Sequence, residues 1–285
     1  MKTKQSHLWL LAALAAPVAH FSGCGWLTAL TTAAVVLPLA LLRKDWSFSK
    51  PVALIQIIWL GIVAGSFLPA AAACWPSGSA LAVPLTLLTL AALTEASRAP
   101  RIGAVLAFAM GLLALPIALS GAAKLESKWL TPTPLIWEPM LALVFLLPAL
   151  PAGVKEKGRG ILSVGILTAA LSGLVQGILS PNMAPSLPDP EYQTARTLGY
   201  LEPMAAAALT MGWYSMISWL FASAAEIAQN SHMEERLSHV LLWGTAAFGL
   251  LIKWQLPAPF LMVLSVFLWC FTPFFQKMKK VKNSA

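Results

Sequence analysis

The sequence predicts an all-α membrane protein with ten transmembrane helices. Of its 285 residues, 58% are hydrophobic and only 11% are charged, whereas soluble domains carry roughly 25% charged residues. The apolar residues stand in long runs rich in Leu and Ala. A transmembrane β-barrel would instead show alternating apolar and polar residues. Because backbone polar groups in lipid must be paired within their own segment, we expect each run to form a helix.

Ten apolar runs are long enough to cross the ~30 Å hydrocarbon layer of a bilayer. Charged residues, proline or glycine bound them, and they lie at 7–22, 24–42, 51–72, 79–96, 102–121, 134–152, 160–179, 198–227, 237–253 and 257–275. One helix over 7–42 would be too long for a single crossing at about 1.5 Å per residue. We therefore expect two spans there, joined only by the tight turn "SGCG". We expect residues 1–285 to form one integral membrane domain.

The placement of basic residues supports this number of spans. With both termini cytoplasmic, the inner segments hold all of the 19 basic residues except Lys124, Lys128, Arg196 and Lys253. An excess of Lys and Arg in cytoplasmic loops orients membrane proteins. Adding or removing one span would invert every later segment and destroy the asymmetry. The same placement, in short clusters between apolar runs, argues against nucleic acid as a partner.

Several functional classes find no support in the sequence. It contains no P-loop, HExxH or GxSxG motif, and we expect no soluble domain at either end. Residues 1–20 could be taken for a signal peptide, but no polar region follows them. An enzyme acting on lipid would need a buried cluster such as paired Asp or His, and the predicted mid-membrane depths contain none. We therefore expect no catalytic site, cofactor or metal.

The predicted outer face carries two cysteines and two long loops. Cys24 and Cys74 could form a disulfide there, or remain two separate apolar side chains. Together with Cys270 they show no spacing typical of a metal site. The loops at 121–134 and 180–196 lack apolar periodicity, so we expect irregular lids or tethers.

The chain divides into two halves of five spans each, 7–121 and 134–275. An odd number of spans per half places the second half upside down relative to the first, which is the inverted repeat common among secondary transporters. In such folds the first span of each half is typically broken, and its freed backbone groups bind substrate or ions. Here the first span contains Pro17 and the sixth contains Pro139, so the predicted broken helices 1 and 6 open the two halves.

Glu138, in "LIWEPM", is the most informative acid of the sequence. An acid inside a span costs about 2.5 to 3.5 kcal/mol on insertion scales and usually faces a cavity or a partner. Pro139 has no N–H, so the carbonyl of Leu135 lacks its helical donor and is available to a ligand. Glu138 also lies only one turn below the predicted outer edge, beside Trp137, from where it could reach interfacial water. Both interpretations stay open.

The other candidate substrate-binding residues are polar or aromatic side chains within the spans: Pro17, His20, Gln56, Trp213, Tyr214 and Ser215. His20 suits a ligand or a proton relay, or simply an interfacial residue. Gln56 and Gln176 are more typical of hydrogen bonds between helices than of substrate contacts. The cluster from Trp213 to Ser215 lies near the middle of the eighth span, where it suits a substrate wall or ordinary packing.

Three stretches resemble the spore germination permeases, the membrane-embedded B subunits of germinant receptors, which belong to the amino acid–polyamine–organocation superfamily. They are "LTLLTLAALTEASRAPRIGAVLAFAMGLLALPIAL" at 85–119, "WEPMLALVFLLPALP" at 137–151 and "TARTLGYLEPMAAAALTMGWYSMISWLFASAAEIAQ" at 194–229. The resemblance covers most of the chain in topology and less than a third in motif. The chain is shorter than usual for the family and has Pro203 where a basic residue often follows the acid.

The resemblance implies a ten-helix, five-plus-five fold that recognises an amino acid or similar small nutrient near spans 1, 3, 6 and 8. It also implies a bacterial cytoplasmic or spore inner membrane, with a sister membrane subunit and a lipoprotein as partners. The sequence therefore predicts a permease-like protein that binds a small organic solute, for transport or for sensing. The rival prediction is a non-transporting subunit that assembles other membrane proteins.

Overall fold

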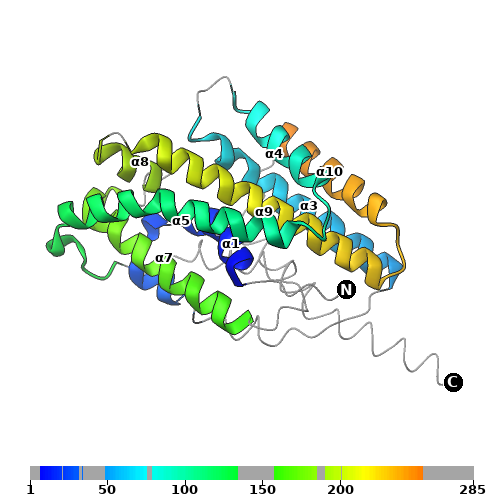
Figure 1. The fold of residues 1–285 in the computed structure, drawn as a ribbon, viewed down its shortest axis with the longest axis horizontal. Coiled ribbons are helices and arrows are strands. Elements are labelled where there is room, and N and C mark those ends of the chain that lie inside the picture. The colour runs from blue at the N-terminus through cyan, green and yellow to red at the C-terminus, as the bar shows by residue number, and fades with distance from the viewer. Residues whose placement is uncertain are drawn as a thin grey trace.

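All regular secondary structure in the described residues is helical. The computed structural model describes residues 7–20, 22–31, 34, 49–75, 79–133, 157–184, 190–199 and 201–252. Its α-helices (Figure 1) are α1 (His7–His20), α3 (Lys50–Ala72), α4 (Ala82–Leu93), α5 (Ala99–Lys124), α7 (Lys157–Leu179), α8 (Pro190–Thr197), α9 (Glu202–Asn230) and α10 (Glu235–Leu251). Two short 3₁₀ helices, η1 (Ser22–Cys24) and η3 (Ser127–Trp129), accompany them, and residues 26–31 are also helical. The predicted all-α class is confirmed.

Three described helices, α3, α5 and α9, are long and apolar enough to cross a membrane, which indicates a membrane protein. They match predicted spans, as do α7 and the shorter α1, α4 and α10, each within a few residues of its expected bounds. Only part of the predicted span 24–42 lies among the described residues. The spans predicted at 134–152 and 257–275 lie outside them.

Proline and left-handed residues mark several helix ends. A proline stands in the first turn of α3, α5 and α9, where its missing N–H removes no helical hydrogen bond. After α9 the chain reverses at His232, whose φ of 54° is left-handed. The N–H of Met233 then donates to the carbonyl of Ala228 at 2.9 Å, which satisfies one of the carbonyls that a helix end leaves open.

The predicted break of the first helix at Pro17 is wrong in its position. α1 runs through Pro17 to His20 without interruption. Proline is tolerated inside a membrane helix when neighbouring helices hold it, and α1 packs against α5, α7 and α9. The change of direction comes later, at η1 and at Gly25, whose φ is 87°.

The two outer loops are more ordered than predicted. α5 continues to Lys124 and is followed by η3, within the segment expected to be irregular. In the second loop, residues 190–197 form the helix α8, whose buried side chains are Pro190, Glu191, Thr194 and Ala195. This helix packs on α1, α7, α9 and η1, and that packing supplies the stability that its sequence pattern did not indicate.

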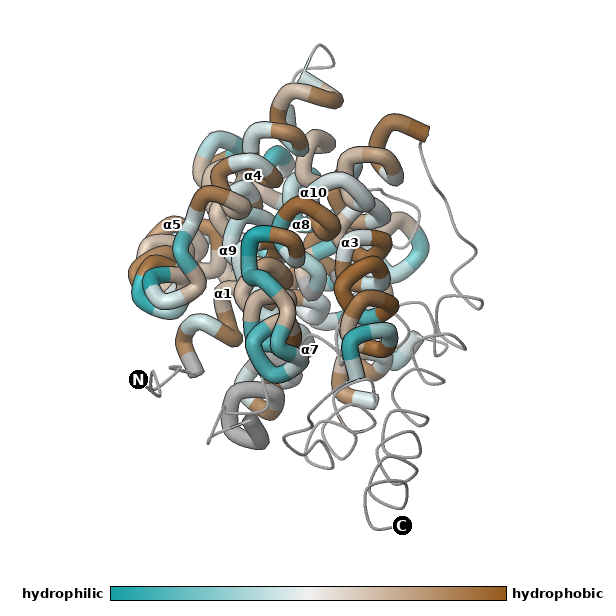
Figure 2. Tube along the Cα trace, turned by 90° about the vertical axis from the view of Figure 1, so that its right-hand side faces the viewer, coloured by the Kyte–Doolittle hydropathy of each residue, from teal (hydrophilic) through white to brown (hydrophobic). Residues whose placement is uncertain are grey.

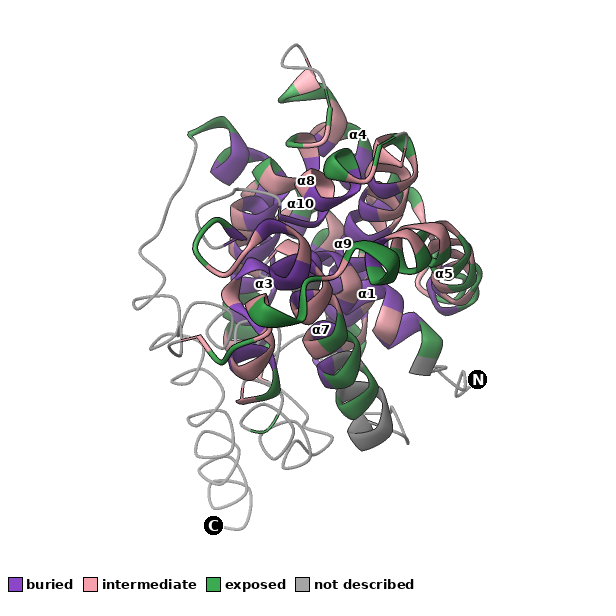
Figure 3. Cartoon of the chain, turned by 90° about the vertical axis from the view of Figure 1, so that its left-hand side faces the viewer, coloured by how far each residue is buried: buried purple, intermediate pink, exposed green. Residues whose placement is uncertain are grey.

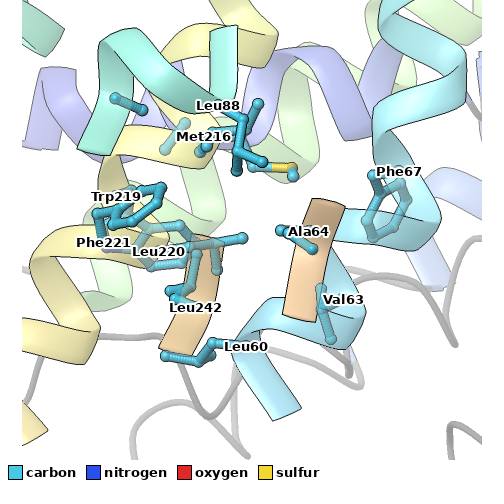
Figure 4. Close-up of a cluster of buried hydrophobic side chains, with 14 of the residues drawn as sticks. Leu60, Val63, Ala64, Phe67, Leu88, Met216, Trp219, Leu220, Phe221 and Leu242 are labelled. Carbon is cyan, nitrogen blue, oxygen red and sulfur yellow. The ribbon is translucent and has the colours of Figure 1, made fainter. Parts of the chain in front are cut away.

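The centre of the protein is a set of four helices, α3, α4, α9 and α10, in which every helix contacts the other three. Figure 4 shows their buried side chains meeting, with Leu60 and Val63 from α3, Leu88 from α4, Met216 from α9 and Leu242 from α10. All five are at most 1% exposed. Burial of this kind of apolar surface, together with close packing, is what holds the four helices in one unit.

Glycines allow two pairs of helices to approach closely and reveal their directions. Gly61 of α3 faces Leu242 and Thr245 of α10, and Gly65, one turn later, faces Ala246 and Gly249, so α3 and α10 run parallel. Likewise, Trp9 of α1 lies over Gly103 of α5. Seven residues further along each of these two helices, α1 and α5 both contact Gly212 of α9. α1 and α5 therefore also run parallel, as alternating spans in the predicted topology do.

The helix α9 is central and α5 is peripheral. α9 contacts α1, α3, α4, α5, α8 and α10, and 67% of its most apolar stretch is buried, against 6% for α5. Figure 3 shows α5 at the edge of the bundle with mostly exposed and intermediate residues. Figure 2, seen from the end where α9 and α10 are joined, shows hydrophilic residues at the ends of several helices. This distribution suits a bundle with lipid around its middle.

Candidate functional site

The strongest candidate site is an aromatic cluster in which three helices meet. His20 ends α1, Phe67 lies in the last third of α3, and Trp213 lies in α9. The indole of Trp213 is 6.2 Å from the imidazole of His20 and 5.9 Å from the ring of Phe67, measured between centroids. The first pair is edge to face, an arrangement that aromatic quadrupoles favour. We call His20, Phe67 and Trp213 the aromatic cluster.

Small residues bring the cluster together. A Cβ on Gly212 would come within 2.9 Å of the Cβ of Ala16, so α1 and α9 approach as closely as their backbones allow. His20 follows Ala16 by one turn and Trp213 follows Gly212 directly, so this close contact carries the two rings to one place. Phe67 comes from α3, which packs on another side of α9.

Trp213, Tyr214 and Ser215 do not form the single cluster that the sequence predicted. Consecutive residues of a helix point about 100° apart, and here they have different surroundings. The hydroxyl of Tyr214 lies 2.7 Å from Oγ1 of Thr94, at the end of α4. Ser215 is 1% exposed and follows Gly212 by three residues, on the side of α9 that meets α1 and α5. Only Trp213 joins the aromatic cluster.

Two other predicted site residues lie within helices and are not part of the aromatic cluster. Gln56 is buried in α3, eleven residues before Phe67, which places it about 16 Å away along the helix. Pro17 is buried inside α1 and lies one turn before His20. The predicted residues Glu138 and Pro139 lie outside the described residues, and their part in the site stays a prediction.

The helix α8 lies beside the end of α1 and the start of α9. A Cβ on Gly23, just beyond His20, would overlap the carbonyl of Ala184 and come within 2.8 Å of Pro190 Cγ. Glu191 is only 9% exposed, and acids are rarely so buried unless they have partners. Arg196 pairs with Glu202 at 3.4 Å, an exposed pair that ties α8 to the start of α9 and contributes little energy.

Tyr192 of α8 packs against the core. Desolvation by burial raises the pKa of the Tyr192 phenol, and the nearby Glu202 and Cys74 raise it further, while Arg196 lowers it. The phenol therefore stays neutral at physiological pH and can donate a hydrogen bond. Cys74 and Cys24 are not joined in a disulfide.

A second group of polar contacts joins the connector that follows α5 to the end of α7 and to the turn after α1, all of them at the predicted outer side. Gln176 of α7 donates from Nε2 to the carbonyls of Trp129 at 2.6 Å and Thr131 at 2.7 Å. Trp26 donates from Nε1 to the carbonyl of Leu130 at 3.1 Å. The N–H of Glu126 also donates to the carbonyl of Gly177 at 3.0 Å. We call Gly25, Trp26, residues 125–133, Gln176 and Gly177 the outer clasp.

Chemically, the aromatic cluster suits binding better than covalent catalysis. Aromatic faces attract an organic cation such as an ammonium group, and an imidazole can donate or accept one hydrogen bond. No three His, Cys, Asp or Glu side chains of the described segments gather where they could hold a metal ion.

No family model matches the chain, and no curated protein matches it.

Sequence reasoning missed Phe67, Thr94 and the outer clasp. Phe67 stands in an unremarkable apolar run, so no pattern distinguished it from a lipid-facing residue. Gly25 offered a usable signal, because a glycine between a short apolar run and the next one marks a tight turn. Gln176 was expected to form hydrogen bonds between helices, and its partners are instead the backbone carbonyls of a connector.

Proposed function

We propose that this protein is an amino-acid-permease-like membrane protein that binds a small organic solute, for transport or for sensing. The observation that carries the proposal is the meeting of His20, Phe67 and Trp213 from three separate helices. A ligand site in a helical membrane protein is typically formed between helices, by a few polar groups on a mainly apolar wall. In this site the aromatic rings would hold the apolar part or the ammonium group of the solute, and His20 would supply a polar contact.

The packing of the central helices is compatible with an inverted repeat, although four helices that all contact one another satisfy the required exchanges whichever way they are paired. In the predicted five-plus-five arrangement α3 corresponds to α9 and α4 corresponds to α10. If α3 is exchanged with α9 and α4 with α10, the contact between α3 and α4 becomes the contact between α9 and α10. The contact between α3 and α10 likewise becomes the contact between α9 and α4. All four contacts exist. A bundle built from two similar halves has this property, and transporters of this type bind solute where the halves meet.

The parallel pairs support the alternation of direction from one span to the next in the predicted topology. α1 and α5, like α3 and α10, are odd-numbered spans in that scheme, and each pair runs in one direction. α5 and α7 also end near one another, as the hydrogen bond between Glu126 and Gly177 requires.

We propose further that the solute belongs to the class that the resemblance implies, an amino acid or a similar nutrient. The patterns at 85–119, 137–151 and 194–229 carry this part of the proposal. In a spore former, the protein would act as the permease subunit of a germinant receptor in the inner membrane, beside a sister subunit and a lipoprotein.

A thermal unfolding screen on the purified protein tests the proposal. The twenty common L-amino acids are added together and then singly, and a true ligand at 100 times its Kd stabilises the folded state by about 2.7 kcal/mol. The same ligand should stabilise a Trp213→Phe variant much less, because the indole face is lost. A ligand that stabilises both proteins equally would place its site elsewhere, and no response to any amino acid would remove this solute class.

The second candidate function is a non-transporting subunit that assembles a membrane complex. The exposed face of α5 favours it, since Val105, Phe108, Leu112 and Leu119 are 55–70% exposed. Such a face contacts lipid or a partner helix. Purification of a stable complex from the native membrane, with no ligand-dependent change in unfolding temperature, would support this function over the first.

A further inference from the structure

We infer that Gln176 is a positioning residue, which holds the connector between the two halves against the first half and thereby sets the geometry of the ligand site. This inference rests on the proposed function. It concerns a residue that does not touch the solute and that acts through the outer clasp.

The amide of Gln176 has one possible orientation. Its side chain is 1% exposed, and its Nε2 atom lies 2.6 Å and 2.7 Å from the carbonyl oxygens of Trp129 and Thr131. Exchanging the nitrogen and oxygen would set an acceptor against two acceptors at these distances, which is repulsive. The Oε1 atom must therefore face the other way, towards Gly25.

The other side of the connector is held by the first half of the chain. Trp26 donates to the carbonyl of Leu130, between the two carbonyls that Gln176 holds. A Cβ at Gly25 would overlap Oγ1 of Thr133 and come within 3.3 Å of Oε1 of Gln176. Gly25 has a φ of 87°, a conformation that glycine adopts readily. The connector thus lies between α7 and the turn after α1, in contact with both.

Two buried polar atoms of the clasp lack hydrogen-bond partners, namely Oε1 of Gln176 and Oγ1 of Thr133. Both lie beside Gly25, and the Thr133 hydroxyl is the donor nearest to hand for Oε1 if the two are brought into contact. An unmade buried hydrogen bond is costly, so the clasp would be more stable in a tighter arrangement in which this bond forms. A solute that favours the tighter arrangement would be bound more strongly when the clasp is intact.

The clasp is close in sequence to both segments predicted to bind solute. Gly25 follows His20 by five residues, and Thr133 precedes Glu138 by five residues. Gln176 therefore holds the chain close to each of the two segments that are predicted to bind solute. Coupling between two sites is reciprocal, so if Gln176 strengthens ligand binding, the ligand must also strengthen the clasp.

Hydrogen exchange and ligand affinity, measured on the same variants of the full chain, test the inference. Gln176→Leu keeps the size of the side chain and removes both donors. Ser172→Ala is the matched control, because Ser172 lies one turn earlier on α7, is fully buried and has no hydrogen-bond partner on its hydroxyl. Trp26→Phe removes the donor on the opposite side of the connector and serves if Gln176→Leu fails to fold.

In Gln176→Leu we expect the backbone amides of residues 126–131 and 133 to exchange about tenfold faster and the Kd of the amino acid found in the screen to rise at least about fivefold. Ser172→Ala should leave both values unchanged. In the wild type, adding that amino acid should slow exchange of the same amides, and in Gln176→Leu it should slow them less. A purely structural role of Gln176 would not produce this ligand-dependent protection.

Unchanged exchange in both Gln176→Leu and Trp26→Phe would show that these residues do not hold the connector and would overturn the inference. Faster exchange with an unaltered Kd and no ligand-dependent protection would leave a structural clasp and overturn the positioning role alone. If the wild type responds to no amino acid, the proposed function fails and the positioning role fails with it. The exchange rates would in that case still report whether Gln176 holds the connector.

Discussion

The imidazole of His20 meets the indole of Trp213 at an interplanar angle of 67°, with 6.2 Å between the ring centroids. The two residues belong to helices that lie far apart in the sequence and that touch through the small residues Ala16 and Gly212. The contact is therefore a direct consequence of how closely α1 and α9 can approach. A site of this kind is sensitive both to the rings themselves and to the helix spacing beneath them.

Trp213→Phe should weaken ligand binding, whereas Trp219→Phe should not. Both indoles are at most 3% exposed and both lie in α9, so each substitution should lower the free energy of unfolding by a similar amount, roughly 1–3 kcal/mol. Only Trp213 contacts His20 and Phe67. Thermal unfolding with and without ligand separates the two effects. Equal loss of ligand response in both variants would indicate general damage to the core and count against the aromatic cluster.

Tyr214→Phe should lower stability without changing ligand binding, because the Tyr214 hydroxyl is engaged by Thr94 at 2.7 Å. We expect Tyr214→Phe and Thr94→Val each to cost about 1 kcal/mol. Thr94→Val also removes the hydrogen bond from Thr94 Oγ1 to the carbonyl of Leu90 at 2.8 Å. The double variant should nevertheless cost less than the sum of the two single ones, since both changes remove the hydrogen bond between Tyr214 and Thr94. Denaturant unfolding of the four proteins measures this coupling. Fully additive costs would mean that the bond contributes nothing.

Gly25→Ala and Gly111→Ala should change stability in opposite directions. At Gly25 a side chain would be strained by the left-handed φ, at a cost of about 1–2 kcal/mol, and would also displace Thr133. At Gly111, in the middle of α5, a Cβ would meet nothing within 4 Å, and alanine is the better helix former by about 1 kcal/mol. Unfolding temperatures of the two variants check both signs, and a neutral Gly25→Ala would contradict the described turn.

Cysteines placed at Ser97 and Ser127 should differ in their labelling by an impermeant external thiol reagent. Both positions are exposed in the structure, so they differ only in the side of the membrane on which they are predicted to lie. In intact cells, after removal of Cys24, Cys74 and Cys270, Ser127→Cys should react and Ser97→Cys should not. Equal labelling of both before cell lysis would rule out the predicted topology.

Glu138→Gln should reduce ligand binding while expression stays normal. The substitution keeps the shape of the side chain and removes its charge, so it separates electrostatic recognition from packing. The expectation follows from the sequence, where an acid inside a span usually faces a partner. Binding of the amino acid found in the screen is the measurement, with Glu234→Gln, at an exposed position between α9 and α10, as the control. Wild-type affinity in Glu138→Gln would leave interfacial water as its only partner.

What stabilises each element decides whether the sequence could predict it. Long apolar runs have to form helices in lipid, so helices such as α3 and α9 were placed within a few residues. The direction in which a side chain points around a buried helix is not encoded in such a run, because apolar residues cover all of its faces. That is why Trp213, Tyr214 and Ser215 were grouped together although only Trp213 reaches the cluster.

The other departures have equally local causes. Pro17 indicated a break, but packing on three sides keeps α1 helical past it. α8 was not predicted because its eight residues gain their stability from contacts with α1, α7 and α9, which no local pattern reports. Gln176 could be expected to form hydrogen bonds, yet its partners depend on where the connector folds back.

The central position of α9 has a consequence for how the protein is made. In the proposed topology the chain enters the membrane in the order of its synthesis, so α1, α3, α4 and α5 are present there well before residue 230 has left the ribosome. Each of them nevertheless completes its packing against α9. The helices that insert first must therefore remain loosely associated until α9 has inserted and packed among them. A chain truncated before residue 202 should accordingly be inserted in the membrane yet be removed quickly by membrane proteases, because it exposes the interface that α9 would cover.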